Sequence, residues 1–320
     1  MKIVDTHCDA LWKMQKFERE NRTFSFQHYP LLQVNEERLR KGKIKLQFFA
    51  IFVEPDIPIE LKWQTALAQV ELFHRHVIEP NPSIIHIKNW AEIDMLKDGE
   101  IGAILAVEGL DIIGNDMTRL RFLRQLGLLS FGLTWNEANL FADGSLEKRG
   151  AGLTALGREV IHYFNEHTLL TDISHASDKA TMEMIELATY PIASHSNCRA
   201  VCDHPRNISD YTLQRLFQKK GMIHINFYPP FLSNEKRRAT IEDIVRHLAH
   251  ICEIGGEDFV GFGSDFDGID LVVKGVANVG MYPCLLEELG NYFTETQIEK
   301  FASKNFLRFV ERTKAGKETI

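Results

Sequence analysis

The sequence predicts an α/β fold, a single (β/α)8 TIM barrel with a helical insertion after its first strand. Short apolar segments alternate along the chain with amphipathic segments of helical periodicity. Most of the apolar segments are hydrophobic on both faces, which is typical of parallel strands covered by helices. Eight of them occur at the spacing of βα units, and eight is the number of strands that closes this barrel.

The expected elements follow from these runs in chain order. Strands are expected at KIVDTH (2–7), LQFFAIFV (46–53), GAILAVEG (102–109), LLSFGLTW (128–135), LLTDISH (169–175), PIASHS (191–196), GMIHINF (221–227) and FVGFGSDFD (259–267). Helices are expected at 61–79, 116–126, 154–167, 178–189, 209–220 and 240–255, with Asp178 and Ser209 as N-caps. No glycine-rich phosphate loop follows the first strand, which argues against a dinucleotide-binding fold.

Three further stretches complete the expected single domain, residues 1–320. Residues 11–45 are too long for a minimal connection and are expected to form the helical insertion. Residues 268–293 are rich in glycine and valine, and we expect a loop over the barrel mouth. Residues 294–313 are expected to form a closing helix, because Thr294 and Gln297 have the spacing of a capping box.

Composition narrows the class of protein. The 320 residues carry a net charge of −7 without a basic stripe, so no nucleic-acid partner is expected. We find neither the pattern of a secretory signal nor an apolar run long enough to span a bilayer, so no membrane partner is expected. The five cysteines are an odd and sparse set, which favours a reducing, cytoplasmic location over a disulfide framework.

Polar side chains gather where the expected strands end, and catalytic groups of a TIM barrel lie at this rim. His7 and Asp9 are two residues apart, so they share one face of the first strand and can bind one ion together. The other strand ends carry Glu108, Trp135 with Asn136, His175, His195, and Asp265 with Asp267.

Imidazole and carboxylate groups in one place suit zinc or a similar divalent metal. Glu108 is able to bridge two ions, which would hold a shared hydroxide as nucleophile. Each residue also has a purely structural explanation: Glu108 as a helix cap, the histidines as loop residues, and the aspartates as turn residues. Their joint position at the ends of separate strands favours the two-metal site.

At these residues the chain resembles the membrane (renal) dipeptidases, a branch of the metal-dependent amidohydrolase superfamily. The resemblance rests on DTHCD, AVEG, DISHAS, SHSNCRAVCDHPRN and VGFGSDFDG, in this order across nearly the whole chain. It implies a zinc-dependent (β/α)8 barrel that cleaves dipeptides, assembles as a homodimer and, in bacteria, is often cytoplasmic.

The resemblance also implies a role for individual residues. His7 and Asp9 would hold the first zinc ion, His175 and His195 the second, and Glu108 would bridge both. Asp265 would act as general base on the attacking water and then protonate the leaving amine. Arg206 would bind the terminal carboxylate of the substrate, a task that suits the two-pronged guanidinium group; alone, it reads more simply as a surface ion-pair residue.

One position departs from the family pattern. Many members have a histidine after the fourth strand that hydrogen-bonds the substrate carbonyl, whereas this chain has Trp135 followed by Asn136. We expect both to line the substrate site, although Trp135 also reads as a packed aromatic residue at the rim. Asp267 is expected to support its loop, with binding of the substrate's amino group as the alternative.

The sequence therefore predicts a zinc-dependent dipeptidase, with a D-residue accepted at the second position. Hydrolysis of another small amide, an N-acyl amino acid or a lactone is the alternative, and Trp135 gives a reason to keep it. A metal-binding or scaffolding protein without turnover is a third hypothesis, which the full set of ligands and Asp265 disfavours.

Overall fold

The computed structural model describes residues 1–235 and 239–315; residues 236–238 and 316–320 of the expected domain lie outside the described part. Within that part, eight parallel strands form a closed barrel, because β9 pairs with β1 and β2 pairs with β4. The barrel strands are β1 (Ile3–Asp5), β2 (Ile44–Phe52), β4 (Ile101–Glu108), β5 (Leu128–Gly132), β6 (Leu170–Asp172), β7 (Pro191–Ala193), β8 (Met222–Ile225) and β9 (Val260–Phe262). The predicted fold class and all eight predicted strands are confirmed.

The observed strands are mostly shorter than the predicted runs, and this matters for the site. β6 ends at Asp172 and β9 at Phe262, so His175 and Asp265 lie in the turns beyond them. Both residues have positive φ angles, 69° and 64°, which non-glycine residues rarely adopt. A ninth strand, β3 (Ile84–His86), was not predicted; it pairs with the first residues of β4, outside the closed circuit.

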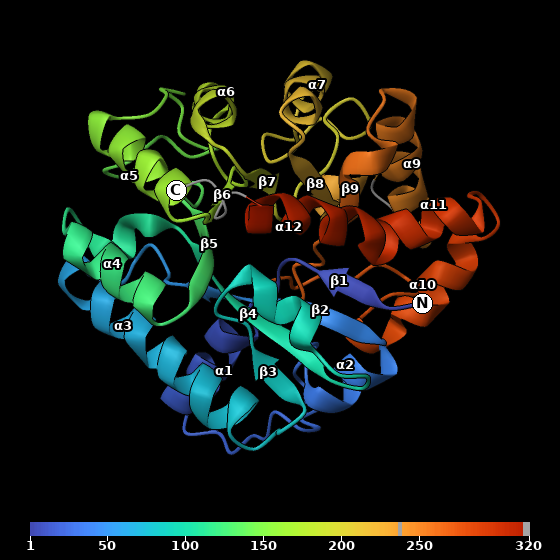
Figure 1. Ribbon diagram of the computed structural model, residues 1–320, viewed down its shortest axis with the longest axis horizontal. Helices are drawn as coiled ribbons and strands as arrows, with labels where there is room; N and C mark the ends of the chain where they lie inside the picture. The colour runs from blue at the N-terminus through green and yellow to red at the C-terminus, as the bar shows by residue number, and fades with distance from the viewer. Residues whose placement is uncertain (236–238, 316–320) are drawn as a thin grey trace.

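Helices surround the strands, as Figure 1 shows. They are α3 (Ile59–Leu72) with a π-helical continuation (Phe73–Ile78), α4 (Met117–Gln125), α5 (Ala155–Glu166), α6 (Asp178–Leu187), α7 (Asp210–Gln218), short α8 (Pro229–Leu232) and α9 (Ile241–Glu253). Ser209 caps α7 as predicted, but Ser177 rather than Asp178 caps α6. The serine hydroxyl accepts from the N–H of Ala180, and Asp178 occupies the first helical position, where its charge favours the helix dipole.

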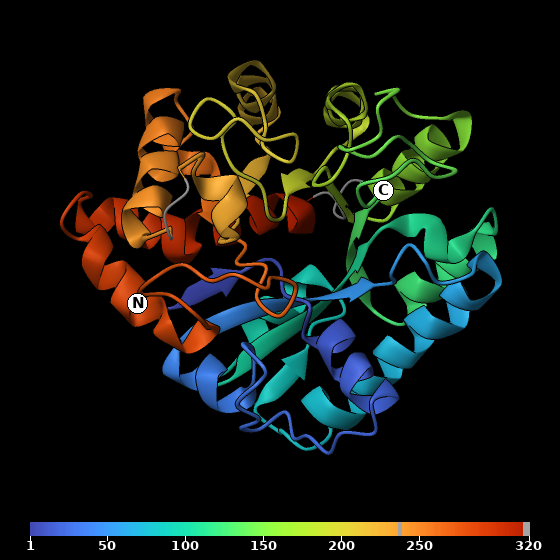
Figure 2. The ribbon, with the colours of Figure 1, turned by 180° about the vertical axis from the view of Figure 1, so that it is seen from behind.

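The predicted insertion contains α1 (Ala10–Arg19) and α2 (Glu36–Lys41). The loop expected over 268–293 is only partly a loop, because its second half forms α10 (Tyr282–Leu289). Pro283 is in the first turn of this helix, where a missing N–H costs nothing, and the buried residues of the helix are Tyr282, Leu285 and Leu289. The first half crosses the strands in Figure 2, and Gly268 and Ile269 line the pocket described below.

The C-terminal segment closes the other end of the barrel. It forms α11 (Glu295–Glu299), a π-helical turn (Lys300–Lys304) and α12 (Asn305–Ala315), with the predicted Thr294–Gln297 capping box present. Phe306 packs at this end with ring centroids 5.6 Å from Phe48 and 5.9 Å from His224. Among the described helices, none has the length and apolar character needed to cross a membrane.

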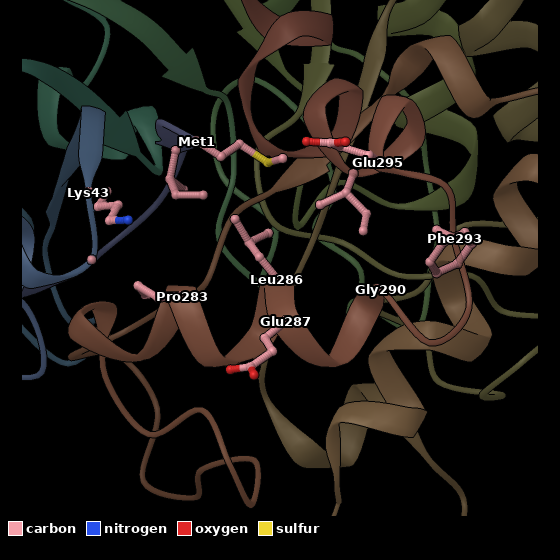
Figure 3. A pocket seen from close by; sticks show the side chains of 11 residues that line it. Met1, Lys43, Pro283, Leu286, Glu287, Gly290, Phe293 and Glu295 are labelled. Atoms are coloured by element: carbon pink, nitrogen blue, oxygen red, sulfur yellow. The ribbon is translucent and has the colours of Figure 1, made fainter.

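An apolar hollow of about 460 Å³ also lies at this end, between the starts of β1 and β2 and helix α10. Figure 3 shows Met1, Pro283, Leu286 and Phe293 around it. It contains none of the predicted site residues, and catalytic groups of this fold lie at the opposite end of the strands.

Candidate active site

A pocket of about 450 Å³ lies at the C-terminal ends of the strands. Aromatic side chains form its walls, and carboxylate and imidazole groups form its polar floor. Its lining includes Asp9, Trp12, Phe52, Glu108, Trp135, Asn136, His175, Tyr228, Phe231 and Asp265. Residues from seven different segments therefore meet where the sequence predicted that chemistry would be found.

One side of the floor is formed by the ends of β1 and β9. The Nε2 atom of His7 lies 3.3 Å from Oδ2 of Asp9 and 4.0 Å from Oδ1 of Asp265. One ligand atom from each of these residues lies within 4.8 Å of the others, which is a spacing able to enclose a cation. Asp265, predicted as a proton carrier, therefore lies beside the predicted first-ion pair.

The other side of the floor is formed by the turns after β6 and β7. The Nε2 atoms of His175 and His195 lie 2.8 Å apart. Oε1 of Glu108 is 2.7 Å from the first nitrogen and 3.4 Å from the second, while its Oε2 atom is 3.7 Å from Nε2 of His7. The two oxygens of Glu108 therefore face the two halves of the floor.

The polar atoms fit a metal centre better than they fit one another. Among the described residues, Nε2 of His7 and Oδ1 of Asp9 are buried without a hydrogen-bond partner. Unpaired buried groups of this kind cost free energy unless a ligand satisfies them. Nitrogen and carboxylate donors in this number suit a divalent ion of the zinc type.

The pKa values of the histidines in the floor also favour a metal centre. Burial, with the nearby charge of Arg206, lowers the pKa of His175 and of His195 well below 6.5, so both imidazoles are neutral and able to coordinate. Burial alone would lower the pKa of His7, but Asp9, Glu108 and Asp265 outweigh it and raise the value to about 10. This concentration of buried negative charge favours a cation.

The carboxyl groups of Asp265 and Glu108, in the same floor, have pKa values shifted in opposite directions. Burial raises the pKa of Asp265 to about 8, and the charges of Asp9 and Glu108 add to the effect against that of His7. Burial also acts to raise the pKa of Glu108, but nearby positive charge, above all that of His7, outweighs it and lowers the value to about 2. Neighbouring acids whose pKa values lie far apart are typical of active sites.

Arg206 is buried close to the floor, with 4% of its surface exposed. One Nη atom donates to the carbonyl of His195 at 3.2 Å, and the guanidinium lies 5.6 Å from the centre of the Phe231 ring. Burial lowers its pKa to about 10, against the attraction of Glu108 and Asp265. Its Nε atom has no partner, and no ion pair joins it to a carboxylate in residues 1–235 and 239–315.

The residues after β5 have two different environments. The Trp135 ring stacks 5.9 Å from the ring of His175 and lies 5.3 Å from that of Phe52, so it forms a wall of the pocket. The Oδ1 atom of Asn136 lies 2.8 Å from Nδ1 of His175. Asn136 therefore lines the pocket and also contacts the ring nitrogen of His175 that faces away from Glu108.

Asp267 points away from the floor. Its Oδ1 atom accepts from the N–H of Gln33 at 2.7 Å, and its Oδ2 atom accepts from the N–H of Val34 at 2.9 Å. The side chain is buried against the insertion and is absent from the pocket lining. Asp267 therefore ties the turn after β9 to the insertion.

Two residues of the site, Gly268 and Asn226, were not predicted from the sequence. A Cβ atom at position 268 would lie 2.2 Å from Oδ2 of Asp9, so only glycine leaves the floor open there. Asn226, just after β8, donates to Oδ2 of Asp265 at 2.9 Å. The glycine in SDFDG was a usable signal, whereas nothing in INFYPP marks Asn226.

Comparison with known proteins decides the family. The model of the membrane dipeptidases, peptidase family M19, matches residues 1–320. The chain belongs to this family. It is therefore a metallo-dipeptidase, an enzyme that hydrolyses peptide bonds, and the predicted family and enzyme class are confirmed.

Relatives of this dipeptidase match most of its length. An uncharacterised dipeptidase of Schizosaccharomyces pombe is 30% identical over 331 residues, covering 97% of this chain and 80% of its own. Dipeptidase aclJ of Aspergillus oryzae is 30% identical and covers 90% of this chain and 72% of its own. A metallopeptidase from Rhodobacter sphaeroides, liganded with a phosphinate mimic of L-Ala-D-Ala, superposes with a TM-score of 0.90 at 27% identity, covering 98% and 99%.

The position of Asp267 leads to a prediction for this dipeptidase. In Asp267→Ala, the N–H groups of Gln33 and Val34 lose their acceptor, so the free energy of unfolding should fall by about 1–3 kcal/mol. Urea unfolding measures the loss. KM for dipeptides should stay within about twofold; a large rise in KM with unchanged stability would instead support binding of the substrate's amino group.

Proposed function

We propose that this dipeptidase hydrolyses dipeptides with two divalent metal ions, most consistent with zinc, held on either side of Glu108. The observation that carries the proposal is the division of the Glu108 carboxylate, whose oxygens lie 3.7 Å from His7 and 2.7 Å from His175. Candidate ligands are His7 and Asp9 on one side, and His175 and His195 on the other. Bound there, the ions would supply a Lewis acid for the carbonyl and lower the pKa of water.

Asp265 is proposed as the proton carrier. Asn226 holds its Oδ2 atom, while its Oδ1 atom faces the floor 4.0 Å from Nε2 of His7. A carboxyl group in this place is able to take a proton from the attacking water and give it to the departing amine. The raised pKa of Asp265, about 8, supports this use of both protonation states.

Arg206 is proposed to bind the C-terminal carboxylate of the dipeptide. A buried guanidinium without an acidic partner is costly unless a ligand supplies one. Its interactions with Glu108 and Asp265 place its charge beside the polar floor. A carboxylate held there would set the distance from the chain end to the bond that is cut, which explains a preference for dipeptides.

A D-residue at the second position of the substrate is part of the proposal. The solved Rhodobacter sphaeroides relative carries a mimic of L-Ala-D-Ala, and it matches this chain over 98% of its length. Hydrolysis of another small amide, an N-acyl amino acid or a lactone is the second candidate. Trp135 favours it, because an indole has one N–H donor and no charge to offer a substrate carbonyl.

Location and assembly are also part of the proposal. The five free cysteines support a reducing compartment such as the cytoplasm. The homodimer expected from the family resemblance stays a prediction.

The role of Arg206 can be tested with Arg206→Met. Loss of a charge-assisted contact should raise KM for L,L- and L,D-dipeptides about 10- to 100-fold. A dipeptide amide or a neutral lactone should be little affected, since neither carries the carboxylate. Arg215→Met is the control: Arg215 lies on α7, pairs with Glu186 and Gln218 on the surface, and does not line the pocket. An equal rise in KM for acid and amide would contradict the assignment.

The role of Asp265 can be tested with Asp265→Asn. The amide keeps the shape but cannot carry a proton, so kcat should fall about 10²- to 10⁴-fold. Metal content should stay at the wild-type value, measured by atomic emission on purified protein. Full activity, or loss of metal together with activity, would contradict a proton-carrying role, the latter by making Asp265 a ligand.

A further inference from the structure

Two aspartate–serine pairs join neighbouring strand ends beneath the polar floor. The first pair links β6 to the turn after β7. Oδ1 of Asp172 accepts from the backbone N–H groups of Ser174 and Ser194, both at 3.0 Å. Its Oδ2 atom accepts from the hydroxyl of Ser194. Asp172 thereby fixes the position of the residue that directly precedes His195.

The Ser194 hydroxyl also fixes which nitrogen of His195 carries hydrogen. Its proton points to the Asp172 carboxylate, since a carboxylate only accepts. Its oxygen lies 2.8 Å from Nδ1 of His195, so this nitrogen must be the donor. The neutral imidazole then has its lone pair on Nε2, the atom that faces Glu108.

Asn136 does the same for His175. Its Oδ1 atom lies 2.8 Å from Nδ1 of His175 and also accepts from the hydroxyl of Ser145 at 3.2 Å. An amide oxygen accepts, so Nδ1 of His175 donates and Nε2 carries the lone pair. Two lone pairs 2.8 Å apart and an oxygen of Glu108 then converge without a proton between them. A cation bound there would satisfy all three atoms.

The second pair, Asp5 and Ser264, has the same hydrogen-bond pattern, but the residue that follows its serine is an aspartate and not a histidine. Oδ1 of Asp5 accepts from the backbone N–H of Ser264 at 3.0 Å, and its Oδ2 atom accepts from the Ser264 hydroxyl at 2.6 Å. Tyr282 adds a hydrogen bond to the same oxygen at 3.0 Å. Ser264 precedes Asp265, which has no tautomer to set. The fold thus contains a natural control for the first pair.

We propose that Asp172, Ser194 and Asn136 are positioning residues that set the tautomers of His195 and His175, and thereby the affinity of the ion these histidines hold. The inference rests on the proposed two-metal function and adds which residues control one of its two sites. Partners behind a metal-binding histidine commonly change metal affinity 10- to 100-fold. The Asp5–Ser264 pair should leave this ion's affinity unchanged.

The test is a zinc titration of metal-free protein against a chelating dye. Wild type should show two sites, and His195→Ala identifies which of them depends on this imidazole. Ser194→Ala should weaken that site about 10- to 100-fold and leave the other unchanged. Ser194→Thr, which keeps a hydroxyl, should restore the affinity. Ser264→Ala, matched in burial and hydrogen bonding, should lose stability without weakening the site.

The outcomes separate the two claims. An unchanged zinc affinity in Ser194→Ala, or an equal loss in Ser264→Ala, would overturn the inference. If Ser194→Ala does not fold, Asn136→Ala at the edge of the pocket takes its place, with the same 10- to 100-fold loss expected and an unchanged affinity contradicting the inference. A wild-type protein that binds fewer than two ions would overturn the proposed function instead.

Discussion

The structure depends on one constraint: negative charge is concentrated where water is largely excluded. The side chains of Asp9 and Glu108 are 4% and 9% exposed, that of Asp265 is 15% exposed, and His7 lies among them. Buried carboxylates of this density repel one another and are stable only with compensating positive charge. Within the chain, the buried guanidinium of Arg206 and the imidazole of His7, whose pKa is raised to about 10, face these three acids, and cations from outside the chain would complete the compensation.

The barrel supplies this arrangement because its parallel strands all end at one rim. Each strand contributes one or two side chains, and the turns beyond β6 and β9 take positive φ angles at His175 and Asp265 to aim them inward. Such backbone costs free energy and persists where the surroundings enforce it. Asp5 and Asp172 help to enforce it, because their carboxylates accept hydrogen bonds from the backbone N–H groups of Ser264 and Ser194 on the neighbouring strand ends.

Much of this was predictable from the sequence because apolar runs and their polar ends are local signals. The eight barrel strands and the convergence of His7, Glu108, His175 and His195 follow from such signals. β3 was missed because only the short run at 84–87 marks it, whereas each barrel strand has a run of at least six residues, and α10 was missed because glycines and valines before it suggested a loop. The contacts of Asn136, Ser194 and Asp172 join segments more than 20 residues apart, and their pairing depends on barrel register. Individual residue types do not reveal such pairings.

The most direct test of the account is the metal content of purified protein, with Glu108→Gln as the comparison. The amide keeps the size of the side chain and removes the charge that faces both histidine groups. The account predicts two equivalents of divalent metal per chain in the wild type and fewer than one in Glu108→Gln, with the fold retained by circular dichroism. Two equivalents that survive the substitution, or a single equivalent in the wild type, would contradict it.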